Sequence, residues 1–213
     1  MRGAIFDMDG LLIDSERIWQ ATWHELARER GIVLPDSFAA EMCGLGGAAA
    51  AELIRRRYGT DDPRPIQMEC AARVHRKEEN GVPLKAGVRT ILEGMRAEGY
   101  RIAIASSSPA EMIHRNLKPH GIDSLFDVFT SGKEVPRGKP DPDIYLLAAE
   151  RLGLPPEECY AFEDSCKGIE SGWRAGCRTI MIPDLVQPDE RTREMCSCVF
   201  ASLGEAWESL KRF

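Results

Sequence analysis

The chain has 213 residues, of which 43% are hydrophobic and 29% are charged, and its formal net charge at pH 7 is −6. This length and balance fit a globular protein with one large domain, or with a domain that carries a smaller one. The acidic charge disfavours nucleic acid or an anionic membrane as the main partner, because both require a basic surface.

A membrane span or a secretion signal is not indicated either. No apolar stretch approaches the roughly 20 residues of a membrane-spanning helix, and the N-terminus leads into a predicted strand instead of an apolar signal core. The seven cysteines are scattered and lack a C-x-x-C spacing, which favours small reduced thiols over redox or metal-binding groups. We therefore expect a cytoplasmic protein without a membrane partner, and we expect it to be a monomer.

The first predicted strand, residues 2–6, ends in a pair of aspartates. Side chains two residues apart on a strand share a face, so Asp7 and Asp9 can both project into one site beyond the strand. Gly10 then allows a sharp turn. Two carboxylates this close repel each other unless a cation lies between them or one keeps a proton. The pair indicates either a site for a hard dication such as Mg²⁺ or an acidic turn after an edge strand.

Residues 15–81 carry helical patterns and no strand pattern. The first helix is capped by Asp14 and Ser15 and ends at Gly31, and further helices are expected from residue 35, over 48–58 and over 65–79. A glycine-rich segment, residues 43–47, is expected to be a flexible loop. We predict an all-helical inserted domain over residues 15–82 and a core made of residues 1–14 and 83–213.

After residue 87, helices and strands alternate. The patterns predict helices over 88–99, 109–120, 142–153, 165–176 and 203–210, and strands over 101–105, 127–130, 159–162, 179–182 and 198–201. This alternation predicts an α/β fold, a doubly wound, Rossmann-like parallel sheet covered by helices on both faces. In such sheets the functional site lies beyond the carboxyl ends of the strands.

Three further strand or loop ends carry residues suited to phosphate and metal chemistry. Ser106 and Ser107 precede a helix that begins near Pro109, where hydroxyls and free N–H groups can bind an anion. Lys139 stands in a loop rich in glycine and proline, and Glu163-Asp164 follows another strand. Each feature alone is compatible with helix capping or a solvated lysine. Together with the aspartate pair they predict one site for a metal ion and a phosphate.

Four stretches resemble the haloacid dehalogenase (HAD) superfamily, in the branch that has a helical cap after the first strand. They are DMDG at 7–10, ASSS at 105–108, GKPDP at 138–142 and EDS at 163–165. The resemblance covers the whole chain in order. This branch includes β-phosphoglucomutase and sugar-phosphate phosphatases.

The resemblance implies a role for each motif residue. Asp7 would be the nucleophile that forms an aspartyl-phosphate, and Asp9 would protonate the leaving alcohol and then deprotonate the attacking water. Ser106 and the N–H groups that follow it, from Ser107 on, would bind the phosphoryl oxygens, and Lys139 would neutralise the phosphate and Asp7.

The resemblance also implies a Mg²⁺ cofactor. Its ligands would be Asp7, the backbone carbonyl of Asp9 and Asp164, with help from Glu163. The expected function is a Mg²⁺-dependent phosphatase for a small phosphorylated metabolite, most simply a sugar phosphate. A dehalogenase needs no proton donor, so Asp9 favours phosphoryl transfer.

Two departures from β-phosphoglucomutase favour hydrolysis over mutase chemistry. Trp19 stands where the mutase has a histidine, and the 43–47 loop lacks the lysine and arginine that hold a second phosphate. A mutase and a non-catalytic binding protein remain the alternatives. Trp19 and Trp23 either line the substrate pocket or pack the inserted domain, and Arg73, His75 and Arg76 either reach the substrate or form a solvated face.

Overall fold

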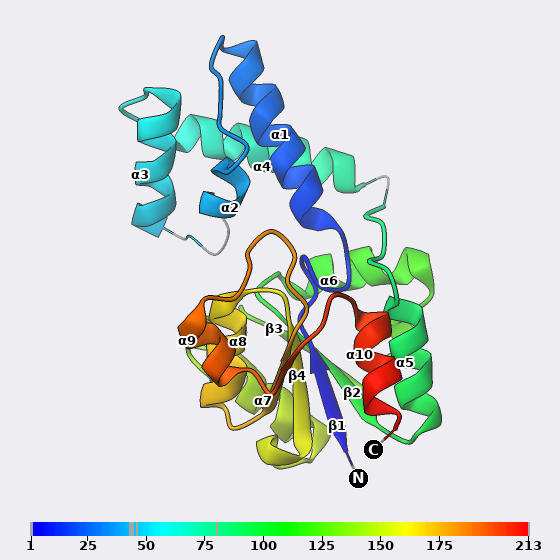
Figure 1. Cartoon of the computed structure of the whole chain (residues 1–213). Coiled ribbons are helices and arrows are strands. Elements are labelled where there is room, and N and C mark those ends of the chain that lie inside the picture. Colours follow the sequence, from blue (N-terminus) through cyan, green and yellow to red (C-terminus); the bar gives the residue numbers. More distant parts are fainter. Residues whose placement is uncertain (1, 43–44, 46, 80, 213) are drawn as a thin grey trace. The chain divides into compact units, whose positions relative to one another are not determined.

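The computed structural model describes residues 2–42, 45, 47–79 and 81–212 (Figure 1). Cys43, Gly44 and Gly46 of the predicted flexible loop lie outside the described residues. The chain forms two compact units, one made of Met1–Ile13 and Leu84–Phe213 and the other of Asp14–Pro83. Across the described residues, every helix is too short or too polar to cross a bilayer.

The first unit is built on a parallel sheet with six strands in the order β3-β2-β1-β4-β5-β6. The strands are β1 (Gly3–Phe6), β2 (Arg101–Ser106), β3 (Val128–Ser131), β4 (Cys159–Glu163), β5 (Arg178–Met181) and β6 (Cys198–Val199). Because β1 pairs with β2 on one side and β4 on the other, its residues are buried throughout. The predicted α/β fold with a parallel Rossmann-like sheet is confirmed.

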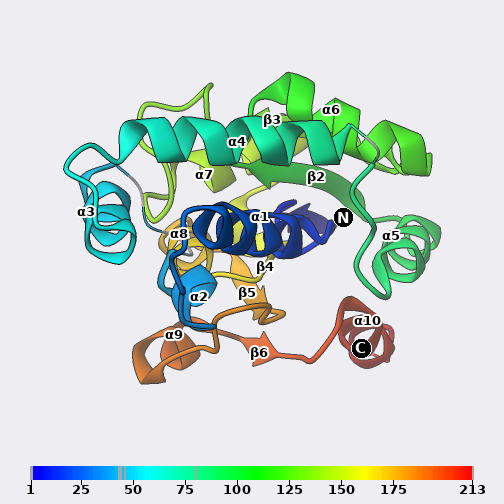
Figure 2. The ribbon, with the colours of Figure 1, turned by 90° about the horizontal axis from the view of Figure 1, so that it is seen from above.

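Helices cover both faces of this sheet. They are α5 (Val88–Ala97), α6 (Ala110–Leu117), α7 (Asp143–Leu152), α8 (Cys166–Arg174), α9 (Glu190–Met195) and α10 (Leu203–Leu210), with 3₁₀ turns at Lys118–His120, Asp123–Leu125 and Pro156–Glu158. Figures 1 and 2 show α7 and α8 on one side of the sheet and α5 and α10 on the other. Successive side chains along each strand point to opposite faces of the sheet.

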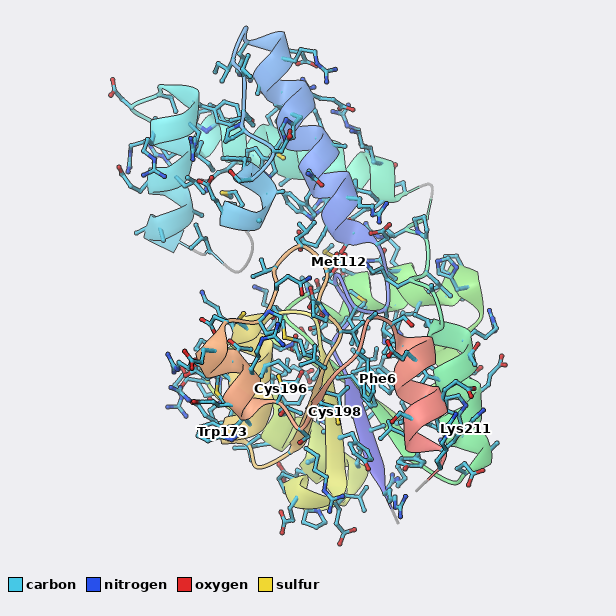
Figure 3. All side chains as sticks on the ribbon, viewed as in Figure 1. Phe6, Met112, Trp173, Cys196, Cys198 and Lys211 are labelled. Carbon is cyan, nitrogen blue, oxygen red and sulfur yellow. The ribbon has the colours of Figure 1, made fainter. Side chains whose placement is uncertain are left out.

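The side chains of the strands divide accordingly. Ile5, Ala103 and Ala161 form one buried cluster with the apolar face of α7. Phe6 and Phe162 stack on each other, with ring centroids 4.4 Å apart. Figure 3 shows Phe6 in the interior and Trp173 on the outer surface, where that side chain is 54% exposed.

Several elements differ from the sequence-based expectation: the last strand, predicted over 198–201, is only Cys198–Val199, and the helix expected from residue 35 begins at Phe38. The helix predicted over 109–120 ends at Leu117 and continues as a 3₁₀ turn, because Pro119 has no backbone N–H for an α-helical hydrogen bond. Helix α9 was not predicted at all. It is six residues long, and only Thr192 and Met195 are buried, so it has too few apolar positions to produce a helical period. Its start is set by Asp189, which accepts a hydrogen bond from the Thr192 N–H at 2.7 Å.

The second unit is entirely helical within the residues that the structure describes. It contains α1 (Ser15–Glu29), α2 (Phe38–Met42), α3 (Gly47–Tyr58) and α4 (Arg64–Glu78). Trp23, Phe38 and Tyr58 meet edge to face at its centre, and the Tyr58 hydroxyl donates to the Trp23 carbonyl at 2.8 Å. The role of this unit as a cap stays a prediction.

Ion pairs join α1 to α4. The Arg73 guanidinium of α4 binds Glu29 of α1 at 2.6 Å, and Lys77 of α4 binds Glu25 of α1 at 2.7 Å; Arg73 also binds Glu69 of its own helix at 2.6 Å. These pairs hold Arg73 and Lys77 within the helical unit. Trp19 is half-buried, and it lines a pocket of about 220 Å³ within this unit together with Glu16, Gln20, Trp23, Ala39, Met42 and Leu45.

A first prediction concerns the contact between α5 and α10. A Cβ atom on Gly94 of α5 would overlap the indole ring of Trp207 on α10. Gly94→Ala should therefore lower the free energy of unfolding by about 1–3 kcal/mol, although alanine is the better helix former. Urea unfolding measures the effect. Thr90→Ala, at an exposed position of the same helix, is the control and should be neutral or slightly stabilising; equal stability of Gly94→Ala and the wild type would contradict the contact.

Candidate active site

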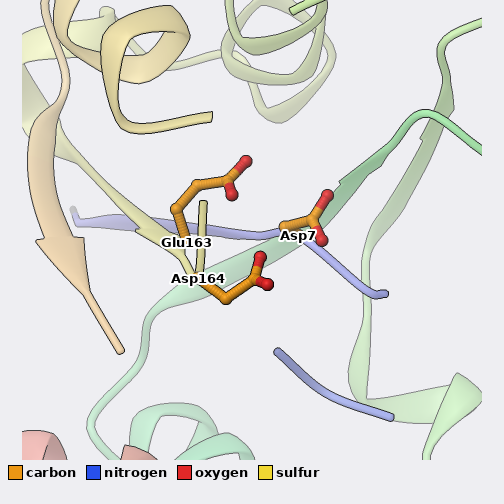
Figure 4. Close-up of side chains that lie close together, drawn as sticks. All are labelled: Asp7, Glu163 and Asp164. Carbon is orange, nitrogen blue, oxygen red and sulfur yellow. The ribbon is translucent and has the colours of Figure 1, made fainter. Parts of the chain in front are cut away.

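Three carboxylates converge where β1 and β4 end. Phe6 lies beside Phe162 in the sheet register, and the Asp7 N–H donates to the Phe162 carbonyl at 3.0 Å, which brings the following residues of both strands together. Asp7, Glu163 and Asp164 each offer a carboxylate oxygen, and these oxygens lie within 4.8 Å of one another (Figure 4). All three residues are buried. Buried carboxylates this close repel each other strongly, so the cluster suits a hard dication such as Mg²⁺.

Lys139 supplies a positive charge to this cluster. Its ammonium donates to Asp7 Oδ1 at 2.5 Å, to Glu163 Oε1 at 2.6 Å and to the Ala105 carbonyl at 2.9 Å. The Lys139 side chain is only 8% exposed. Burial by itself would lower the pKa of Lys139, but Asp7 and Glu163 outweigh burial and hold that pKa above its usual range. The lysine is therefore charged at any physiological pH.

The protonation of Asp7 depends on the same surroundings. The pKa of Asp7 is raised to about 8 as the net result of opposing effects: burial raises it most, Lys139 lowers it, and Glu163 and Asp9 raise it as like charges. Without a further cation, the Asp7 carboxyl thus tends to keep its proton near neutral pH.

Glu163 is held by hydrogen bonds on both of its oxygens. The Tyr145 hydroxyl donates to Oε1 at 2.7 Å, where Lys139 also binds, and Ser165 Oγ donates to Oε2 at 3.2 Å. The carboxylate fills the space beside Gly168, where any Cβ atom would overlap it. The Lys139 ammonium also lies 5.2 Å from the centre of the Tyr145 ring. Glu163 is thus tied to three surrounding side chains.

Asp9 faces a different set of partners. Gly10, with φ of 81°, turns the chain directly after it. Asp9 Oδ2 accepts hydrogen bonds from Ser108 Oγ at 2.8 Å and from Ser106 Oγ at 3.3 Å. Ser106 is fully buried at the end of β2, whereas Ser107 is exposed. The Asp9 side chain is not part of the carboxylate trio.

The structure therefore brings most of the predicted site residues together. Asp7, Lys139, Glu163 and Asp164 form one cluster, and Asp9 with Ser106 forms a second group that adjoins it through the chain. Ser107 is at the surface of the same loop, and its part in binding stays a prediction.

Sequence reasoning missed two residues that hold the site. Tyr145 lies six positions after Lys139, on the first turns of α7, and its sequence context is that of an ordinary buried aromatic residue. Ser108 belongs to the motif ASSS but was given no role. The available signal was chemical: a tyrosine that is fully buried needs a partner for its hydroxyl, and Glu163 is that partner.

The comparison with protein families decides the assignment. The model of the haloacid dehalogenase-like hydrolases matches residues 4–182. The chain belongs to this family. The resemblance to the HAD superfamily is thus confirmed.

Individual HAD proteins agree with this assignment. Hexitol phosphatase B of Escherichia coli (strain K12) is 32% identical over 188 residues, which cover 84% of this chain and 82% of that protein. A phosphorylated carbohydrates phosphatase of Thermotoga maritima is 30% identical over 184 residues, 84% of each chain. The structure of a HAD family hydrolase from Deinococcus radiodurans R1 with bound phosphate and sodium is 27% identical, with a TM-score of 0.84 over 100% of this chain and 96% of that one. The predicted enzyme class, a phosphoric monoester hydrolase, is confirmed by the family and by these phosphatases.

A second prediction concerns the buried charge of Lys139. In Lys139→Met, Asp7 and Glu163 lose the ammonium that both bind, and the metal-free protein should lose about 3–5 kcal/mol of unfolding free energy because a buried charge is left uncompensated. Urea unfolding in the presence of a chelator measures this. Lys133→Met makes the same change at an exposed position of the preceding loop and should stay within about 0.5 kcal/mol of the wild type. A Lys139→Met protein as stable as Lys133→Met would contradict the assigned pairing.

Proposed function

We propose that this protein is a Mg²⁺-dependent phosphatase that hydrolyses small phosphomonoesters, sugar phosphates in particular, through an aspartyl-phosphate on Asp7. The observation that carries the proposal is the buried cluster in which Asp7 meets Lys139, Glu163 and Asp164. The choice of sugar phosphates is supported by the two related phosphatases, whose names refer to hexitols and to phosphorylated carbohydrates.

The donor set fits a magnesium ion. The trio consists of carboxylate oxygens, which Mg²⁺ prefers, and Lys139 offsets only part of the negative charge. Asp7, Asp164 and the backbone carbonyl of Asp9 would hold the ion. Glu163 would help to hold the ion less directly, because its oxygens already accept hydrogen bonds from Lys139, Tyr145 and Ser165. When bound, the ion would reduce the repulsion between the Asp7 carboxylate and the incoming phosphate.

Each residue of the site would then have a separate role in the reaction. An Asp7 oxygen attacks phosphorus while the bond from phosphorus to the leaving oxygen breaks, and Asp9 gives that oxygen its proton. Ser106 and the N–H groups of the loop beginning at Ser107 bind the phosphoryl oxygens, and Lys139 neutralises charge on the phosphoryl group and on Asp7. In the second half, Asp9 takes a proton from water, the water oxygen attacks phosphorus, and phosphate leaves Asp7.

Hydrolysis is favoured over a mutase reaction by the sequence of the helical unit. Trp19 stands where β-phosphoglucomutase has a histidine, and residues 43–47 include neither lysine nor arginine. A mutase intermediate carries two phosphates, and the second requires cations.

A third prediction tests the nucleophile. The wild type should release phosphate from sugar phosphates when Mg²⁺ is present, and a chelator should abolish the release. Asp7→Asn should lower kcat by at least about 10³-fold, because the amide is a poor nucleophile and a poor metal ligand. A phosphate-release assay with a panel of sugar phosphates measures this, and Asp36→Asn, at an exposed aspartate of the helical unit, is the matched control. Normal turnover by Asp7→Asn would contradict the proposal.

A fourth prediction follows from the raised pKa of Asp7. The ion needs the charged carboxylate. In the metal-free protein Asp7 has a pKa of about 8, so this carboxyl carries a proton when the pH is below about 8. Mg²⁺ binding should therefore release a proton below pH 8, and the affinity should rise by up to about tenfold per pH unit until it levels off above pH 8. Titration calorimetry in two buffers with different heats of ionisation measures both quantities. An affinity that is constant between pH 6 and pH 8 would contradict the assignment.

A further inference from the structure

The loop after β2 presents a serine whose hydroxyl is directed at Asp9. Ser108 Oγ donates to Asp9 Oδ2 at 2.8 Å, a shorter contact than the 3.3 Å from Ser106 Oγ to the same oxygen. The motif-based roles assign nothing to the Ser108 hydroxyl. Ser108 is half-buried, whereas the preceding Ser107 is exposed.

The position of Ser108 is fixed by the neighbouring strand. Ser131, the last residue of β3, donates its hydroxyl to the Ser108 carbonyl at 2.7 Å. The Ser108 N–H donates to Ser106 Oγ at 3.1 Å, and the Gly132 N–H donates to the Ser106 carbonyl at 2.8 Å. The loop is therefore attached to two adjacent strands, and the Ser108 hydroxyl has a defined place relative to Asp9.

We infer that Ser108 is a positioning residue that orients the Asp9 carboxylate for proton transfer to the leaving group. An aspartate side chain has two rotatable bonds and several staggered rotamers, so a hydrogen bond to one of its oxygens helps to select a single orientation. The hydrogen bond from Ser108 holds Oδ2 beside the loop in which the phosphoryl oxygens are proposed to bind. This inference rests on the proposed function.

The consequence is a dependence on the leaving group. A sugar alkoxide is strongly basic and needs a proton as the bond to phosphorus breaks, whereas p-nitrophenolate can leave without one. The ratio kcat/KM reports only the steps up to departure of the leaving group, so it isolates this proton transfer from the later hydrolysis of the aspartyl-phosphate. A residue that orients the acid must therefore affect kcat/KM for a sugar phosphate and spare kcat/KM for p-nitrophenyl phosphate.

The experiment compares Ser108→Ala with the wild type on glucose 6-phosphate, or on the best sugar phosphate of the panel, and on p-nitrophenyl phosphate. General acid catalysis contributes typically about 10²–10⁴-fold, and loss of its orientation should lower kcat/KM for the sugar phosphate by about 10-fold or more. The value for p-nitrophenyl phosphate should change by less than about threefold. Ser108→Thr, which keeps the hydroxyl, should restore most of the loss, and Ser124→Ala at an exposed serine is the matched control.

A second comparison guards against a general effect on folding. Asp9→Asn should show the same preference for the aryl substrate, and adding Ser108→Ala to it should cost no more than about twofold, since the acid that Ser108 orients is already gone. Equal losses on both substrates, or a full additional loss in the double variant, would overturn the inference while leaving the phosphatase function intact. A wild type that hydrolyses neither substrate would overturn the proposed function, and the inference with it.

Discussion

The contact of the Lys139 ammonium with Asp7 and Glu163 is the interaction on which the candidate site depends. Each of these charges is buried, and removing a carboxylate or an ammonium from water costs several kcal/mol unless it is paired. The pairing needs three separate elements in register: the end of β1, the end of β4 and the loop before α7. That loop is itself attached to α8, since Ser171 donates to the Asp141 carbonyl at 2.6 Å. The fold of the core thus determines the charge balance of the site.

The order of the strands explains why these groups meet. β1 lies between β2 and β4, so the segments that follow these three strands leave the same edge of the sheet side by side. In a parallel sheet all carboxyl ends share that edge, and the strand order reverses direction next to β1. The serine loop arrives from β2 and the acidic pair from β4, with the two aspartates of β1 between them. Strands buried on both faces tolerate few polar residues, so the polar groups collect beyond the strand ends.

The position of the site at the strand ends could be predicted from the sequence, because the strands are apolar runs and polar residues follow them. Asp7 and Glu163 could be predicted for that reason, and Lys139 could be predicted because it stands in a loop rich in glycine and proline before a helix. Tyr145 could not, because its contact with Glu163 joins α7 to β4, and a helical pattern does not show which neighbour a buried hydroxyl meets. The role of Gly168 could not be predicted either, although only the absence of its side chain leaves room for the Glu163 carboxylate. Helix α9 could not be predicted because it has no apolar period. It is held in place by the packing of its two buried residues.

The two aspartates of the DMDG motif show how one strand end can support two kinds of chemistry. Asp7 is buried among charged groups, and its partner is an ammonium. Asp9, two positions on, is half-buried and its partners are hydroxyls. A nucleophile benefits from a fixed cation, which stabilises its charged form, whereas an acid-base residue must exchange a proton and would be hindered by the same cation. Identical side chains therefore acquire different roles from their surroundings, and those surroundings come from opposite neighbours of β1: β4 and the Lys139 loop on one side, β2 braced by β3 on the other.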